Sequence, residues 1–355
     1  MGVISLNYFF LSIFIFYFFS IFFNFTKTIL TYFYKFNLSN LLFFLKLLNY
    51  LVGHMDYRII IVSIIVMILI GALSKKIGLL KENDVETLNN IVINIALPCM
   101  IFNALYTADV SLLPRLSILT VYMLITSLIV GVLTYLLLNF LGWDKRKIWS
   151  LVIVVVLGNT GFLGYPITQG IFGNAGMIRA VFCDISTSII FVVLSFILIL
   201  IFDGEIKVAI RKILTFLPLW SIILGITFNI LSIPITSVGS TVVTYLAGAT
   251  IPLIMISLGL SLKIDGLKNH FKEVGLASFI KLIIYPLIAL GVLSLLNITG
   301  FEHTIGLIEA AMSSAMLGLV LAVTYRLDWE LTSDCIFTST VFSLVTIPIF
   351  LMFIL

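Results

Sequence analysis

The sequence predicts an all-α membrane protein with ten transmembrane helices, arranged as two inverted repeats of five helices. Hydrophobic residues make up 61% of the 355 residues and charged residues 10%, whereas soluble domains carry about 25% charged residues. Apolar runs of about 20 residues, the length of a helix that crosses the hydrocarbon core, recur along the chain. Membrane β-strands would instead alternate apolar and polar residues. We therefore expect a multi-pass protein of the cell membrane, in contact with the lipid bilayer.

Residues 1–56 differ from the rest of the chain. They contain 13 of the 30 phenylalanines and only two glycines. No lysine or arginine precedes the apolar run of residues 3–25, so a secretory signal peptide fits poorly. Two interpretations remain, an extra membrane helix or sequence upstream of a natural start at Met55, and we favour the second. The expected membrane-spanning domain is 57–355.

Ten apolar segments follow this extension, and each is long enough to span a bilayer. They form a first repeat over residues 57–202 and a second repeat over residues 213–355. The expected spans are 57–74, 86–106, 113–140, 147–170, 175–202, 213–232, 240–262, 273–297, 302–324 and 330–354.

The loops between these spans carry unequal positive charge. The odd-numbered loops hold 13 lysines and arginines, whereas the even-numbered loops hold only Arg115 and Arg179. Because basic loops stay in the cytoplasm, we expect the odd loops inside and both termini outside. An additional first helix would place the lysines of residues 1–56 outside, which is our reason for favouring Met55. The basic residues form no single face, so nucleic acid is not an expected partner.

A shift of 154 positions aligns the two halves of the chain. Since five is an odd number, the second copy is inverted, and the basic segment 145–147 accordingly aligns with the uncharged turn 299–301. Inverted repeats with interrupted helices are typical of secondary transporters. The aligned pairs are Pro98 with Pro252, Asn159 with Ser313, Leu163 with Leu317, and Gly164 with Gly318.

The span 147–170 contains a run of helix breakers, from Gly158 to Pro166. Backbone freed from a helix inside a bilayer is tolerated only where protein buries it or water reaches it. A broken helix presents free amides at the positive end of its second half, where they can bind an anion. The alternative is a glycine face for close helix packing. We predict that the substrate contacts Asn159, Gly161, Gly164 and Pro166.

The aligned segment in span 302–324 lacks proline and contains Ser313, Ser314 and Gly318. Its hydroxyls can cap freed backbone groups, so we predict a second but weaker break that completes the substrate site. Pro98 and Pro252 predict kinks in two other spans. Their role is either gating or the packing kinks that membrane helices tolerate.

Three ionisable residues lie well inside spans: Asp184, Lys281 and Glu309. Each would cost about 2.5–3.5 kcal/mol facing lipid, so we expect them to face the protein interior or water. Lys281 and Glu309 are candidates for an ion pair, and Asp184 for a proton acceptor. The alternative for all three is snorkelling to an interface, with Lys281 the most suited to it. All three are candidates for coupling transport to protons or sodium.

The sequence offers no catalytic constellation. The three cysteines lie in apolar runs without metal-ligand spacing, and glycines 158, 161 and 164 do not follow a nucleotide-binding pattern. We therefore expect neither an enzyme nor a metal or organic cofactor.

Several motifs together resemble the auxin efflux carrier family, which includes plant PIN proteins and bacterial malate or malonate permeases. The resemblance covers residues 57–355. It implies ten helices as a five-plus-five inverted repeat, with crossed broken helices four and nine, similar to bile-acid symporters and NhaA-like antiporters. It also implies organic anions as cargo. Asn159 and Pro166 fall at the family's first crossover, whereas Ser313 replaces the proline often found in the second. The motifs are Ile91–Pro98, Gly158–Ile167, Ile251–Leu253, Ser257–Gly259, Tyr325–Asp328 and Ser339–Pro348.

The expected function is a secondary transporter or facilitator that exports a small organic anion, a carboxylate, by alternating access around the crossover. One alternative is a cation-coupled symporter of the bile-acid type, which would cluster acidic ligands at the breaks. Another is a passive channel, although the sequence has no ring of repeated charges. The sequence is compatible with a homodimer.

Overall fold

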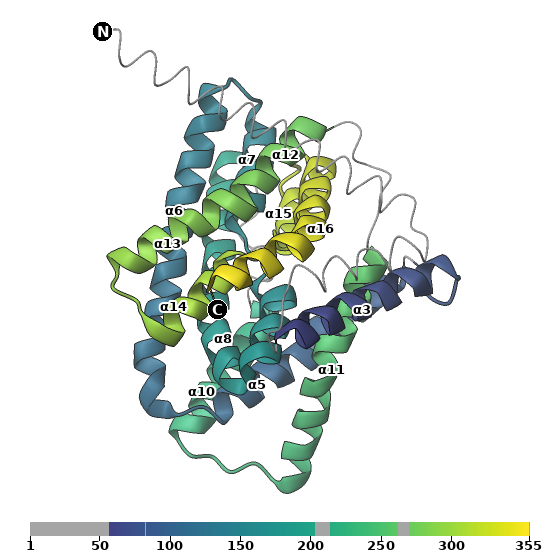
Figure 1. Cartoon of the computed structure of the whole chain (residues 1–355), viewed down its shortest axis with the longest axis vertical. Coiled ribbons are helices and arrows are strands. Elements are labelled where there is room, and N and C mark those ends of the chain that lie inside the picture. Colours follow the sequence, from purple (N-terminus) through teal and green to yellow (C-terminus); the bar gives the residue numbers. More distant parts are fainter. Residues whose placement is uncertain (1–56, 82, 203–213, 262–269, 355) are drawn as a thin grey trace. The chain divides into compact units, whose positions relative to one another are not determined.

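The computed structural model describes residues 57–81, 83–202, 214–261 and 270–354. The expected extension 1–56, with the start at Met55, and parts of two basic loops lie outside the described residues. Every extended element in the described ranges is a helix (Figure 1). The α-helices are α3 (Tyr57–Lys76), α4 (Asp84–Ile91), α5 (Leu97–Tyr106), α6 (Leu113–Phe140), α7 (Lys145–Val156), α8 (Tyr165–Phe202), α10 (Leu217–Ile230), α11 (Ser237–Ser261), α12 (Phe271–Phe279), α13 (Tyr285–Leu295), α14 (Gly300–Ala310), α15 (Leu317–Thr324) and α16 (Trp329–Ile354).

Seven helical segments of the described residues are long and apolar enough to cross a membrane, and α10 is a shorter apolar helix. Large apolar side chains point outward from them; Leu200 is 82% exposed and Phe140 is 86% exposed. Apolar faces of this extent mark contact with lipid rather than water. The multi-pass helical class is thus confirmed. The expected spans 147–170 and 302–324 are missing from these seven because each is interrupted.

The expected loop between spans 147–170 and 175–202 shrinks to one residue. Gly173 has φ 63° and ψ −153° inside α8, a conformation that side chains other than glycine's rarely adopt. The chain turns back at this residue, because the hydroxyls of Thr160 and Tyr165 on one side of it donate to Asp184 on the other. The segments before and after Gly173 are therefore two helices that lie side by side, and the boundary that we predicted between them lies at this turn.

Short π-helical turns precede three prolines, a feature that we did not predict. The turns are η1 (Val92–Ala96), η3 (Thr160–Gly164) and η4 (Ile280–Ile284), and they lead into Pro98, Pro166 and Pro286. Proline cannot donate a backbone hydrogen bond and its ring crowds the preceding turn, and a π turn widens the helix at that place. Pro252, in contrast, lies inside α11.

The helices pack in two groups (Figure 1). In the first helix group, α11 packs along α3 and α5, and α10 packs along α5. In the second helix group, α6 packs against α7, α8 and α13, while α16 packs against α7, α12 and α15. The groups meet where α8 contacts α3 and α5, and where η3 contacts α11.

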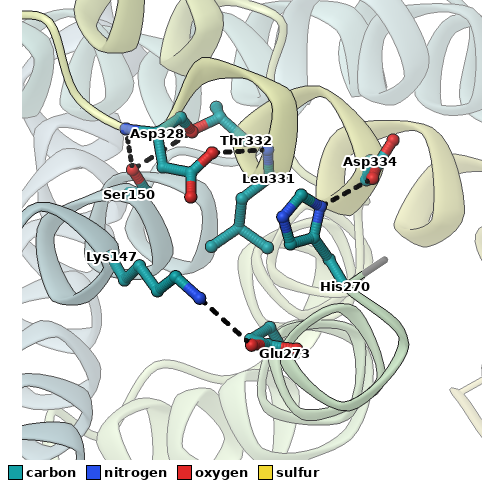
Figure 2. A network of polar contacts seen from close by, with 8 residues as sticks. All are labelled: Lys147, Ser150, His270, Glu273, Asp328, Leu331, Thr332 and Asp334. Atoms are coloured by element: carbon teal, nitrogen blue, oxygen red, sulfur yellow. Dashed lines mark hydrogen bonds and ion pairs between the residues drawn. The ribbon is translucent and has the colours of Figure 1, made fainter. Parts of the chain in front are cut away.

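A polar network joins the N-terminal ends of α7, α12 and α16 (Figure 2). It connects elements of the second helix group that lie far apart in the sequence. Its contacts are Lys147 with Glu273 (3.5 Å), His270 with Asp334 (3.2 Å), and Ser150 with the backbone N–H and carbonyl of Asp328 (3.0 and 3.2 Å).

A second network anchors the start of α14. The carboxylate of Glu302 lies 3.0 Å from Arg179 and 3.7 Å from Arg115, and the Arg179 guanidinium lies 4.4 Å from the centre of the Phe301 ring. The two arginines of the expected even loops therefore meet at one carboxylate. Both interrupted spans thus begin at a polar network.

Candidate functional site

The two interrupted spans meet at their breaks. The first is unwound at residues 157–159, between α7 and η3, and the second at residues 311–316, between α14 and α15. The two segments form an antiparallel bridge between Gly158 and Ser314. The N–H of Asn159 donates to the carbonyl of Ser313 (2.8 Å), and the N–H of Ala315 donates to that of Leu157 (2.9 Å). Each break thus satisfies backbone groups of the other, which a bilayer interior requires.

The first break is shorter than predicted. Gly161, Gly164 and Pro166 lie in the resumed helix, formed by η3 and α8, rather than in unwound chain. The amides of Leu163 and Gly164 both donate to the carbonyl of Asn159 (3.1 Å each). The amides of Thr160, Gly161 and Phe162 precede these donors, and the first amides of a helix have no partner within it.

The prediction of a weaker second break is wrong, because this break covers more residues than the first. Proline is not needed to open it, since side chains of α16 bind the freed segment. The Ser339 hydroxyl accepts a hydrogen bond from the N–H of Ser314 (3.2 Å). The Thr340 hydroxyl donates a hydrogen bond to the Ser313 hydroxyl (3.3 Å).

The three ionisable residues of the spans each lie beside one glycine of the first break region. A methyl group added to Gly158 would lie 3.4 Å from Nζ of Lys281. One added to Gly161 would lie 3.8 Å from Asp184 Oδ1. A methyl group on Gly164 would come within 2.1 Å of Glu309 Oε2, too close to coexist with it. The glycine spacing, which we interpreted as a helix breaker, therefore also makes room for three ionisable side chains.

Asp184 has hydrogen-bond partners that we did not predict. Its carboxylate accepts from the hydroxyl of Thr160 and from that of Tyr165 (2.8 Å). The hydroxyl of Thr187 lies 3.2 Å from that of Thr160. This arrangement holds the carboxylate against the first turn of η3.

Lys281 and Glu309 are both fully buried, with 0% exposure, so neither snorkels to an interface. Their predicted ion pair is not formed among the contacts of the described residues. The Lys281 ammonium instead lies 3.9 Å from the centre of the Tyr285 ring, whose hydroxyl shares a hydrogen bond with Ser127 (2.6 Å). Neither carboxylate oxygen of Glu309 has a hydrogen-bond partner in the described part of the chain.

A cavity of about 460 Å³ borders the paired breaks. The second helix group contributes the breaks and Asp184 to its wall, and the first helix group contributes Asn89 and Pro218. No lysine or arginine of the described residues lines it. Most of the wall is apolar, so the polar groups are concentrated near Asn159, Asp184 and Thr187.

The predicted substrate residues divide into two sets relative to this cavity. Asn159 and Gly161 line it. The others are buried behind its wall: Gly164, Pro166, Ser313, Ser314 and Gly318. Pro98 and Pro252 lie outside the lining, although Leu97 is part of it.

Sequence reasoning missed the hydroxyl groups that support the breaks. Thr160 and Tyr165 stand within the run of helix breakers, and Thr338, Ser339 and Thr340 form a polar cluster inside an otherwise apolar span. Such a cluster within a membrane helix points to partners inside the bundle, and this signal could have identified α16 as the support of the second break.

Comparisons with known proteins indicate a membrane transporter. The family model described as "Membrane transport protein" matches residues 59–208 and 204–351, in agreement with the resemblance inferred from the motifs. A protein of Methanothermobacter thermautotrophicus named as an uncharacterized transporter is 41% identical over 289 residues, covering 81% of this chain and 95% of that protein. A similarly named protein of Methanocaldococcus jannaschii is 37% identical over 297 residues, covering 82% of this chain and 96% of that protein.

Proposed function

Because the chain belongs to the membrane transport protein family, we propose that it is a secondary transporter or facilitator of a small organic anion, a carboxylate, with export as its direction. It is a transporter rather than an enzyme by family. The observation that carries the proposal is the backbone pairing of the two breaks, Asn159 with Ser313 and Leu157 with Ala315, beside a cavity. Interrupted helices that meet inside the bundle are the usual site of substrate in such carriers.

In the proposed architecture ten helices cross the membrane as two inverted repeats of five. Residues 145–156 and 160–172 form the two halves of crossover helix four, and α14 and α15 form those of crossover helix nine. The matched segments 59–208 and 204–351 divide the chain close to the proposed repeat boundary, which supports this assignment. The odd loops face the cytoplasm and both termini face outward.

The anion contacts no positively charged side chain of the described residues in the cavity wall, and the Lys281 ammonium behind Gly158 adds positive potential from a distance. Gly161 lies in the first turn of the resumed helix, at its positive end, and lines the cavity together with Asn159. Partial charges of this kind hold anions in many proteins. Since no lysine or arginine of the described residues lines the cavity, backbone groups are the main source of positive potential.

Alternating access follows from where the cavity lies. Its wall includes Asn89 and Pro218 from the first helix group and the breaks from the second. A movement between these groups would change the side from which the cavity is open while the breaks stay paired.

A second candidate is a cation-coupled symporter of the bile-acid type. It is favoured by one observation, the carboxylate of Asp184 in the cavity wall beside the first break. In this version the cation and the anion enter together, so transport requires the cation gradient.

Exchange in proteoliposomes tests the proposal. The full chain is reconstituted and loaded with malate, malonate or indole acetate, and counterflow of the labelled anion is measured with pH and sodium gradients imposed separately. Saturable counterflow of at least one carboxylate is expected. Absence of counterflow for a range of carboxylates would reject the anion assignment, and an absolute requirement for sodium would favour the symporter.

A variant of Asn159 tests whether the anion binds at the first break. Asn159→Ala removes a hydrogen-bonding group from the cavity wall, and loss of a hydrogen bond to a charged group costs about 1.5–3 kcal/mol. We expect the apparent affinity to fall at least about tenfold. Gly291→Ala is the matched control, because a methyl group there meets open space. Equal affinities of the two variants would place the substrate elsewhere.

A further inference from the structure

Glu309 occupies an unusual position for a carboxylate. It lies in the last turn of α14, directly before the second break, and is 0% exposed. Neither of its carboxylate oxygens accepts a hydrogen bond from a described residue, since the Thr168 hydroxyl beside it donates to the carbonyl of Gly164 instead (2.8 Å). A buried ionised carboxylate without donors is costly, by several kcal/mol even after the protein relaxes. An unpaired carboxylate in this position therefore favours its neutral, protonated form.

The titratable groups around Glu309 do not lower the free-energy cost of ionising its buried carboxyl group. Asp184, Cys183 and Tyr165 of α8 and Tyr122 of α6 are close enough to interact with it electrostatically. The Tyr122 hydroxyl donates its hydrogen bond to the carbonyl of Gly306 (3.1 Å). The Tyr165 hydroxyl donates its hydrogen bond to Asp184, so neither tyrosine donates to Glu309.

The remaining charged neighbour of the break, Lys281 in η4, lies against Gly158 and the ring of Tyr285 rather than within ion-pair distance of Glu309. Its single positive charge can balance one ionised carboxylate in the break region. Asp184 is the better candidate for the ionised state, because two hydroxyls donate to it. Two carboxylates near one another rarely ionise together.

We propose that Glu309 is the proton-carrying residue of the transport cycle, whereas Asp184 stays ionised. This inference rests on the proposed transport function. In the state described here the Glu309 carboxyl group is protonated and occluded. When the crossover becomes accessible from one side, the O–H bond breaks and the proton passes to water, which leaves the carboxylate. Uptake of a proton from water on the other side restores the acid.

A proton suits this site better than a metal cation. Oε2 of Glu309 packs so closely on Gly164 that a methyl group there would overlap it, which leaves little space for an ion at that oxygen. Within the described ranges no group of three or more acidic, histidine or cysteine side chains could hold a metal ion. A proton requires neither the space nor additional ligands.

Infrared spectroscopy tests the assignment without relying on transport. The full chain, in lipid at neutral pH, is labelled with carbon-13 at the side-chain carboxyl groups of either glutamate or aspartate. The carbonyl stretch of a buried protonated carboxyl group is expected to shift with the glutamate label and not with the aspartate label. It should be absent from the isosteric variant Glu309→Gln and remain in Asp184→Asn. A band that follows the aspartate label, persists in Glu309→Gln or is missing from the wild type would overturn the assignment.

Transport by the wild-type chain provides the second arm. Without a membrane potential, coupling of one proton to each anion should change the equilibrium anion gradient about tenfold for each unit of pH difference. Counterflow that ignores the pH gradient would overturn the role of Glu309 and leave the proposed function standing. Failure of all carboxylate counterflow would reject the proposed function itself, while the infrared result would still decide the protonation state.

Discussion

The two helix breaks pair with each other through the backbone, but their surroundings differ in chemistry. The first break faces Lys281, Asp184 and Glu309 through three glycines. The second is held by the hydroxyls of Ser339 and Thr340, which are neutral. Backbone pairing needs only N–H and carbonyl groups, so it places few demands on the side chains.

The shift of 154 positions shows which residue of one half corresponds to each ionisable residue of the other. It aligns Asp184 with Thr338, Lys281 with Ser127, and Glu309 with Val155. Each ionisable residue of the break region therefore has a neutral counterpart in the other half of the chain. Two halves that match the same family model can thus pair their breaks through the backbone and still confine the ionisable side chains to one break. The predictions below compare matched positions of the two halves.

The largest difference is expected between Gly164 and its counterpart Gly318. Gly164→Ala forces a methyl group to within 2.1 Å of Glu309, whereas the nearest atom to a methyl group at Gly318 is 3.8 Å away. Overpacking of this kind costs about 1–3 kcal/mol, so thermal unfolding in detergent should occur at a clearly lower temperature for Gly164→Ala. Gly318→Ala should unfold close to the wild type. Similar unfolding temperatures for the two variants would contradict the close packing of Glu309 on Gly164.

Removal of the Asp184 carboxylate should have the next largest effect. Asp184→Ala leaves the hydroxyls of Thr160 and Tyr165 without their acceptor. A hydrogen bond to a charged group contributes about 1.5–3 kcal/mol, but removal of the buried carboxylate also removes its desolvation cost, which offsets part of this loss. We expect lower stability and at least about tenfold slower anion counterflow. The matched variant Thr338→Ala removes a hydroxyl without a hydrogen-bond partner in the described residues, so it should change both measurements little. A larger loss in Thr338→Ala would reverse the comparison.

The third comparison, between Lys281 and its counterpart Ser127, separates an effect on anion binding from an effect on stability. Lys281→Met keeps much of the side-chain volume, and replacing a buried charge with an apolar group is often neutral for folding. We expect unfolding within about 1.5 kcal/mol of the wild type but about tenfold weaker anion binding, measured by isothermal titration. Its counterpart Ser127→Ala loses a hydrogen bond to Tyr285, worth about 1 kcal/mol of stability, and should bind anion normally. Normal binding by Lys281→Met would show that the ammonium serves packing alone.

The smallest effect is expected at the second break. Thr340→Val removes the 3.3 Å hydrogen bond to Ser313, and a neutral hydrogen bond contributes about 0.5–1.5 kcal/mol. The backbone bridge to the first break does not involve this side chain, so counterflow should stay within about twofold of the wild type. Loss of counterflow in Thr340→Val would mean that hydroxyls of α16 carry function as well as support.

Much of this arrangement could be predicted from the sequence, because it depends on local or repeated patterns. Apolar runs located most of the helices, since a bilayer requires long apolar segments. The glycines and proline located the first break, and the shift located the second. The shift also aligned Asn159 with Ser313, the two residues whose backbones are now joined. The prediction was less accurate for the extent of each break, since cross-chain hydrogen bonds, rather than local propensity, decide where a helix stops.

The sequence by itself determined a multi-pass helical protein, its interrupted spans and the presence of three ionisable residues within apolar spans. Only the tertiary structure decided which of these residues meet. Lys281 and Glu309, adjacent in the order of spans, are not paired, whereas the glycines of the first break receive Lys281, Asp184 and Glu309 from three different elements. Spacing along one helix fixes which residues share a face, but the rotation and depth of its neighbours depend on side-chain packing across the whole bundle.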